Sequence, residues 1–159
     1  IYVQKGSERF FVNPDMPSGF IEKFVASTVQ CDDLLDSIKG KGAELIDVFA
    51  ADPQVKNSVL DNFRSKGYEI ASAAPGVNSA TAGGVNKGAA LLGMCERLGI
   101  TPDEAMAFGD AENDAPMLLI AGLSFAMANG TEPCKLAAKA IAPSNADDGV
   151  AQMINKYAF

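Results

Sequence analysis

AMAFGDAENDAPMLLIAG, residues 105–122, joins an apolar run to a cluster of acids. The run ends at Gly109 and Asp110, and two further acids, Glu112 and Asp114, follow directly. Carboxylates this close repel one another, and burying them costs free energy unless a cation or hydrogen-bond donors compensate. An apolar segment that suits a helix comes next. The stretch therefore predicts a buried strand that ends at a group of carboxylates, with a metal ion as the compensating charge.

Beyond residue 85 the pattern alternates between helices and short apolar strands. The expected strands are 105–109, 123–128 and 139–142, and the expected helices lie near 87–98, 113–121, 132–138 and from 147. In the helix 87–98 one apolar face recurs at helical spacing, formed by Leu91, Met94, Cys95 and Leu98. Strands that alternate with helices pair in parallel. The pattern predicts an α/β layer wound like one half of a Rossmann sheet.

The part before residue 85 has a different pattern. It shows a β-prone hairpin at 1–12, strands at 44–50 and 68–74, and a short strand within 75–86, separated by helical patterns at 20–25, 34–38 and 55–63. These strands suit antiparallel pairing. We therefore expect two domains, an α+β unit at 1–84 and an α/β unit at 85–159.

Composition limits the classes of function. The 159 residues carry a net charge of −7 and a pI near 4.5, which disfavours nucleic acid and anionic membrane surfaces as partners. No apolar run is long enough to span a membrane, no signal-peptide pattern appears, and the three cysteines are scattered, so a cytoplasmic location is expected. Histidine is absent, which excludes Ser-His-Asp and Cys-His catalysis and disfavours a zinc site.

The acids at the end of strand 105–109 are the candidate site. Ligands of open α/β sheets bind at the carboxyl ends of strands, where Asp110 is placed, and Asn113 and Asp114 fall at the start of the next helix. Oxygen ligands alone suit Mg²⁺. The alternative is that one of these residues caps the helix and the other acids are solvated. A calcium loop is excluded, because Ala115 and Ala121 stand where Gly and Glu are needed.

Lys87 is the second candidate. It follows Asn86, a suitable cap, so it is expected in the first turn of the helix 87–98. A cation there opposes the helix macrodipole by roughly 0.3–1 kcal/mol. It is either an exposed lysine without a role or a cation that reaches a phosphate group.

Three segments carry a resemblance to a known family. They are NKGAALLGMCERLGI (86–100), AMAFGDAENDAPMLLIAGLSFAMANG (105–130) and SNADDGVAQMI (144–154). In this order and spacing they resemble haloacid dehalogenase-like phosphatases of the Cof type. The resemblance covers 85–159, the C-terminal part of that family's Rossmann-like core, and residues 1–84 are similar in length and pattern to its α/β cap domain.

The resemblance implies a role for four residues. Lys87 would contact the phosphoryl group and orient the nucleophile, Asp110 would bind Mg²⁺, and Asn113 would contact the phosphate. Asp114 would support the lysine and the metal, and no role is implied for Glu112. The family's nucleophile is the first Asp of an Asp-x-Asp motif, which these residues do not contain. We therefore expect the nucleophile to lie outside the chain and the chain alone to be inactive.

A structural consequence is expected at strand 105–109. In this family that strand pairs with the nucleophile strand, so without it an apolar edge would be exposed. We expect self-association, or pairing with the missing N-terminal segment.

Three functions stay open at this point. The first is a Mg²⁺-dependent phosphatase of small phosphorylated metabolites that forms an aspartyl-phosphate. The second is a phosphotransferase or phosphomutase on the same core, which would pass the phosphoryl group to a sugar hydroxyl instead of water. The third is a non-catalytic, truncated binding domain.

Overall fold

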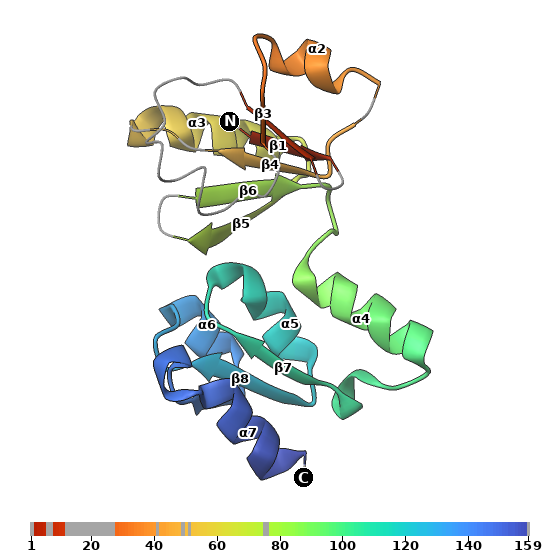
Figure 1. The fold of residues 1–159 in the computed structure, drawn as a ribbon, viewed down its shortest axis with the longest axis vertical. Helices are drawn as coiled ribbons and strands as arrows, with labels where there is room; N and C mark the ends of the chain where they lie inside the picture. Colours follow the sequence, from red (N-terminus) through yellow and green to blue (C-terminus); the bar gives the residue numbers. More distant parts are fainter. Residues whose placement is uncertain are drawn as a thin grey trace. The chain divides into compact units, whose positions relative to one another are not determined.

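The computed structural model describes residues 2–5, 8–11, 28–40, 42–48, 50, 52–74 and 77–158 (Figure 1). The chain forms two compact units, one of Ile1–Ile70 with Pro75–Gly83 and the other of Ala71–Ala74 with Gly84–Phe159. The helix expected at 20–25 lies outside the described residues. None of the helices in the described ranges is long and apolar enough to cross a membrane.

In the described part of the chain the first sheet has six strands, in the order β3-β2-β1-β4-β6-β5. The pairs β1–β2, β1–β4 and β4–β6 are antiparallel, whereas β2 and β3 are parallel. The predicted hairpin is confirmed by the pairing of β1 with β2. The strands are β1 Tyr2–Lys5, β2 Glu8–Phe11, β3 Thr28–Gln30, β4 Leu45–Val48, β5 Glu69–Ala74 and β6 Val77–Thr81.

The described residues of this unit form two helices, α2 Leu34–Ile38 and α3 Pro53–Ser65. Asp52 begins α3, because its side chain accepts a hydrogen bond from the amide of Gln54 at 2.8 Å. Leu60 is the buried residue of this helix, which contacts β4, where Val48 is buried as well. The helix is followed by the left-handed Gly67, a conformation that commonly ends helices.

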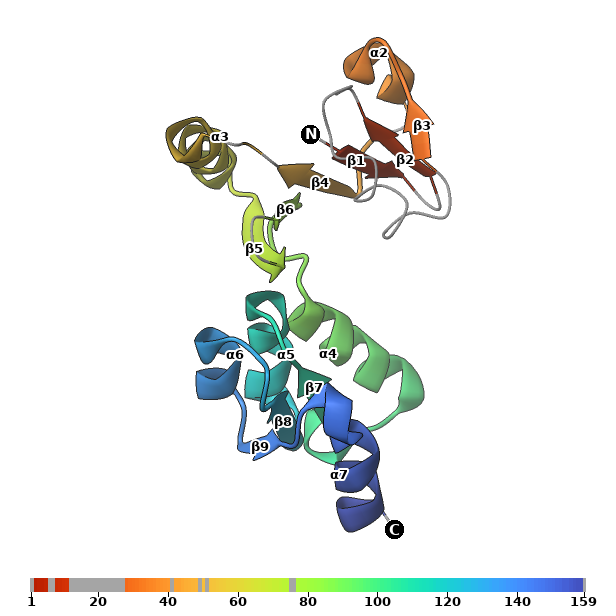
Figure 2. The same ribbon diagram turned by 60° about the vertical axis from the view of Figure 1, so that its left-hand side comes forward.

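The C-terminal unit is built on a parallel sheet, which confirms the predicted α/β class (Figure 2). Its strands, β7 Met106–Gly109, β8 Leu123–Met127 and β9 Ala140–Ala142, pair in the order β7-β8-β9. Because side chains alternate along a strand, each face has its own core. The part after β7 also contains three helices, α5 Ala115–Ile120, α6 Glu132–Ala137 and α7 Gly149–Tyr157, and two 3₁₀ turns, η2 Glu112–Asp114 and η3 Asn145–Asp147.

The two faces of this sheet are covered by different helices. On one face Ala107 and Ala126 pack with Leu118 of α5 and Cys134 of α6. On the other face lie Phe125, Met127 and Ala142, with Met153 of α7 packed against them. The ring of Phe125 is stacked on that of Phe108 and also contacts Tyr157, with both centroid distances 5.4 Å. The sheet is therefore held between helices, and its carboxyl edge is left to the loops.

Helix α4, Lys87–Leu98, precedes the sheet. Its ends agree with the sequence prediction, since the side chain of Asn86 accepts a hydrogen bond from the amide of Ala89 and Gly99 is left-handed. Its apolar face is only half buried. Cys95 is buried and Leu91 packs on the core, but Met94 is 53% and Leu98 64% exposed. Periodicity defined this face without specifying what covers it.

Two helix starts differ from the prediction. The helix expected at 113–121 is divided into the 3₁₀ turn η2 and the helix α5. The helix expected from 147 is α7, which is preceded by the 3₁₀ turn η3, Asn145–Asp147. Pro116 explains the first case, because proline suits the first turn of an α-helix and ends the tighter turn before it. A further 3₁₀ helix, η1 Pro102–Glu104, lies between α4 and β7.

Candidate functional site

Asp114 is the centre of the candidate site. Its side chain lies at the carboxyl end of β7 and the residue is only 4% exposed. One carboxylate oxygen, Oδ1, accepts a hydrogen bond from Nζ of Lys87. The other, Oδ2, accepts from the backbone amides of Asp110 at 2.9 Å and Ala111 at 3.0 Å. One buried carboxylate thus holds together the start of α4 and the loop that leaves β7.

Two glycines make this arrangement possible. A Cβ atom on Gly109 would lie 2.4 Å from Cβ of Asp114. Gly109 is not among the left-handed glycines of the described chain, so a positive φ does not explain the glycine here. It leaves room for the Asp114 side chain. Gly88 has a similar role, because a Cβ there would lie 2.8 Å from the carbonyl oxygen of Pro116, where α4 touches the start of α5.

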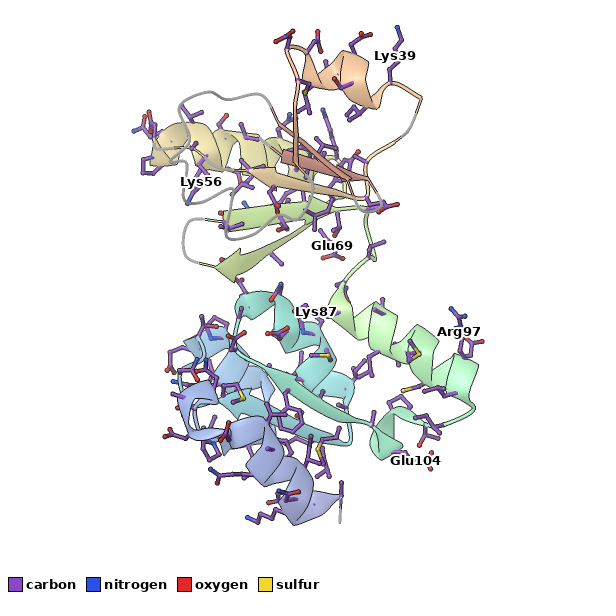
Figure 3. The ribbon with its side chains drawn as sticks, in the orientation of Figure 1. Lys39, Lys56, Glu69, Lys87, Arg97 and Glu104 are labelled. Atoms are coloured by element: carbon purple, nitrogen blue, oxygen red, sulfur yellow. The ribbon has the colours of Figure 1, made fainter. Side chains whose placement is uncertain are left out.

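Lys87 is half-exposed, with 48% of its side chain accessible, and it is paired with Asp114 across 27 residues of chain. It lies in the first turn of α4, the position that disfavours a cation (Figure 3). The ion pair with Asp114 offsets that cost. The structure therefore does not place Lys87 as a solvated lysine without a partner.

The charges of the site shift two pKa values. Burial acts to raise the pKa of Asp114, but hydrogen bonds from Lys87, Ala111 and Asp110 and the charge of Lys87 outweigh it, so the pKa is lowered. Burial raises the pKa of the Cys134 thiol, and the carboxylates of Asp114 and Asp110 raise it further. At Cys134 the charges of these two acids therefore outweigh the opposing charge of Lys87.

Asp110 and Glu112 are exposed, so their carboxylates face solvent while the backbone of Asp110 is fixed. Asn113 is half-buried, and its Oδ1 atom is buried without a hydrogen-bond partner in the described part of the chain. Such an atom costs about 1–3 kcal/mol and calls for an explanation, for example an absent ligand. Among the residues that the structure describes, no group of three or more His, Cys, Asp or Glu side chains is gathered for a metal.

The structure also identifies residues that sequence reasoning missed. The amide of Thr131 donates a hydrogen bond to the carbonyl oxygen of Asp110 at 2.8 Å, and Gly130 lies against the same residue. Gly130 is the last residue of the segment 105–130, which carried the resemblance, whereas no sequence signal pointed to Thr131. Gly88 was likewise not distinguished from the other glycines.

Comparison with known proteins identifies the family. The sequence model of the haloacid dehalogenase-like hydrolases matches residues 8–154. The chain belongs to this family. The resemblance noted from the sequence is thereby confirmed. A haloacid dehalogenase-like hydrolase from Bacteroides thetaiotaomicron superposes on 98% of the chain with a TM-score of 0.76 and 28% identity, and 59% of that protein is covered.

Curated relatives share parts of the sequence. The chain is 39% identical over 107 residues to the 5-amino-6-(5-phospho-D-ribitylamino)uracil phosphatase YcsE of Bacillus subtilis, which is 67% of this chain and 43% of that protein. It is 47% identical over 76 residues, 48% of the chain, to the chloroplastic endoribonuclease YBEY of Arabidopsis thaliana, but covers only 13% of it. The chain thus spans less than half the length of these two relatives.

Proposed function

We propose that this chain carries the metal- and phosphate-binding part of a Mg²⁺-dependent phosphatase that acts on small phosphorylated metabolites. The observation that supports it best is the shared carboxylate of Asp114, which holds a cation, Lys87, beside the loop of an exposed carboxylate, Asp110. A phosphoryl group carries negative charge on several oxygens, so a site for it needs fixed positive charge. The membership of the hydrolase family supports the same reaction class.

Lys87 supplies that fixed charge. Its ammonium group has three N–H donors, of which one points to Asp114. The remaining donors are available to a phosphate at the solvent side, because about half of the side chain is accessible. Asp114 restricts the rotamers of Lys87, so the ammonium group needs less reorganisation when the substrate binds.

Asp110 is the residue that would hold Mg²⁺. An exposed carboxylate on a fixed backbone fits this ion, which commonly uses one or two protein carboxylates together with water and phosphate oxygens. The ion would neutralise charge on the phosphoryl group. The amide of Asn113, whose buried Oδ1 has no partner in the described chain, would contact the phosphate group or a ligand around it.

The nucleophile would be an aspartate outside these 159 residues, which contain no Asp-x-Asp motif. In the complete reaction it would attack phosphorus and form an aspartyl-phosphate that water then hydrolyses. We propose residues 1–84 as the cap domain that selects the substrate. The compound in the name of the B. subtilis relative is a phosphate monoester and is one candidate.

Phosphate release tests this proposal. The 159-residue chain and the protein made from the complete reading frame would be assayed in parallel on sugar phosphates, nucleotides and 5-amino-6-(5-phospho-D-ribitylamino)uracil, with Mg²⁺ or with EDTA. We expect the chain alone to release no phosphate and the complete protein to release it only with Mg²⁺. In the complete protein Lys87→Met should lower kcat by about 100-fold or more. Release that is equal in EDTA, or no release from any phosphate ester, would contradict the proposal.

A further inference from the structure

The loop Ala128–Thr131, which follows β8, lies against Asp110. Gly130 is the point of closest approach. A Cβ atom there would lie 2.9 Å from the carbonyl oxygen of Met127, 3.0 Å from that of Asp110 and 3.1 Å from the Asp110 Cα. These are backbone atoms, which cannot rotate away as a side chain would. A side chain at this position would therefore require one of these backbone segments to shift.

The backbone of Asp110 is held from both sides. Its N–H donates to Oδ2 of Asp114 at 2.9 Å, and its carbonyl oxygen accepts from the amide of Thr131 at 2.8 Å. Both backbone polar groups of this residue are therefore satisfied, while its carboxylate is exposed. The direction of that carboxylate depends on two contacts, one from the loop after β7 and one from the loop after β8.

The loop is itself anchored on its far side. The amide of Gly130 donates to the carbonyl oxygen of Met127 at 2.8 Å, which closes a turn. The side chain of Asn129 accepts a hydrogen bond from the amide of Asn145 at 3.1 Å, in the segment after β9. The three loops at the carboxyl edge of the sheet are thus connected, and a displacement of the middle loop is transmitted to Asp110.

We propose that Gly130 is a positioning residue for the carboxylate of Asp110, acting through the backbone of that residue. The proposal rests on the proposed function only where it concerns the metal. A methyl group at position 130 should push the Asp110 carbonyl away and turn its carboxylate out of place. Partners of a metal ligand typically affect metal affinity by about 10–100-fold when they are changed.

The test compares Gly130→Ala with Gly93→Ala in the 159-residue chain. Gly93 is a matched control, because a Cβ there meets nothing within 4 Å and its backbone φ is not left-handed. Amide NMR spectra and the paramagnetic broadening caused by Mn²⁺, used as a probe for the Mg²⁺ site, are recorded for both variants. We expect Gly130→Ala to shift the amide signals of Asp110 and Ala111 and to raise the Mn²⁺ concentration needed for half-broadening by about tenfold. Gly93→Ala should change neither.

Unchanged Asp110 and Ala111 signals in a folded Gly130→Ala variant would overturn the proposal, as would an unchanged Mn²⁺ response. If Gly130→Ala does not fold, the unaltered chain decides. A scalar coupling across the hydrogen bond between the Thr131 nitrogen and the Asp110 carbonyl carbon is expected, and its absence would overturn the proposal. If Mn²⁺ broadens no signal near Asp110 in the unaltered chain, the proposed role of Asp110 as a metal ligand fails. The role of Gly130 is then still decided by the amide shifts of Asp110 and by the scalar coupling between Thr131 and Asp110.

Discussion

The side chain of Asp114 occupies the space that a Cβ atom on Gly109 would need. Such an atom would lie only 2.4 Å from the Cβ of Asp114. The glycine ends β7 and the aspartate follows five residues later in the chain. The absence of a side chain at the strand end is therefore what lets Asp114 turn back and bind the amides of Asp110 and Ala111. Strand β7, the loop after it and the Lys87–Asp114 ion pair therefore depend on one another.

Gly109→Ala should disturb the contacts between the Asp114 side chain and the loop after β7. Its methyl group would press on the Asp114 side chain, and inserting such a group into a packed site typically costs about 1–3 kcal/mol. We expect a lower free energy of unfolding in urea, measured from NMR signals of the C-terminal unit, together with shifted signals for the Asp110 and Ala111 amides. Unchanged stability and unchanged amide signals would show that the site accommodates the methyl group.

Two glycines of α4 should respond in opposite directions to the same substitution. Gly88→Ala places a Cβ 2.8 Å from the Pro116 carbonyl and should lower the melting temperature, whereas at Gly93 a Cβ meets nothing within 4 Å. In an open helix position Gly→Ala typically stabilises by about 0.5–1 kcal/mol. Thermal unfolding of both variants checks this, and a Gly88→Ala variant as stable as Gly93→Ala would contradict the close packing of α4 on α5.

The ion pair of Asp114 should appear in the pH dependence of stability. Burial opposes ionisation, but the hydrogen bonds from Lys87, Ala111 and Asp110 dominate and hold the pKa of Asp114 below its ordinary value of 3.8. The folded state therefore binds this proton less readily than the unfolded state. The contribution of the group is fully present above the ordinary pKa and is lost as the pH falls through the lower, folded pKa.

Asp114→Asn isolates this contribution. The free energy of unfolding of the original chain minus that of the variant should be about 2 kcal/mol at neutral pH, the usual effect of hydrogen bonds to a charged group. This difference should shrink as the pH falls below 3.8. A difference that stays constant with pH would show that Asp114 is not stabilised in its charged form.

Much of the C-terminal unit could be predicted from the sequence because its signals are local. Asn86, Gly99 and the apolar runs mark helix and strand ends through contacts within a few residues. The role of Gly130 could not be predicted, because its partner, Asp110, is 20 residues away and lies in the loop after another strand. The exposure of Met94 and Leu98 was also not predictable, since periodicity gives a face but not its cover.

The assignment of Asp110 to a metal site is tested most directly by changing Asp110 to Asn. Phosphate release is measured with the protein made from the complete reading frame. Asp103→Asn is the matched control, because Asp103 is another exposed aspartate of the C-terminal unit, outside the candidate site. We expect Asp110→Asn to lower the Mg²⁺-dependent rate by about 100-fold and Asp103→Asn to leave it within about twofold. Equal rates for the two variants would contradict the assignment of this site to metal-assisted phosphoryl transfer.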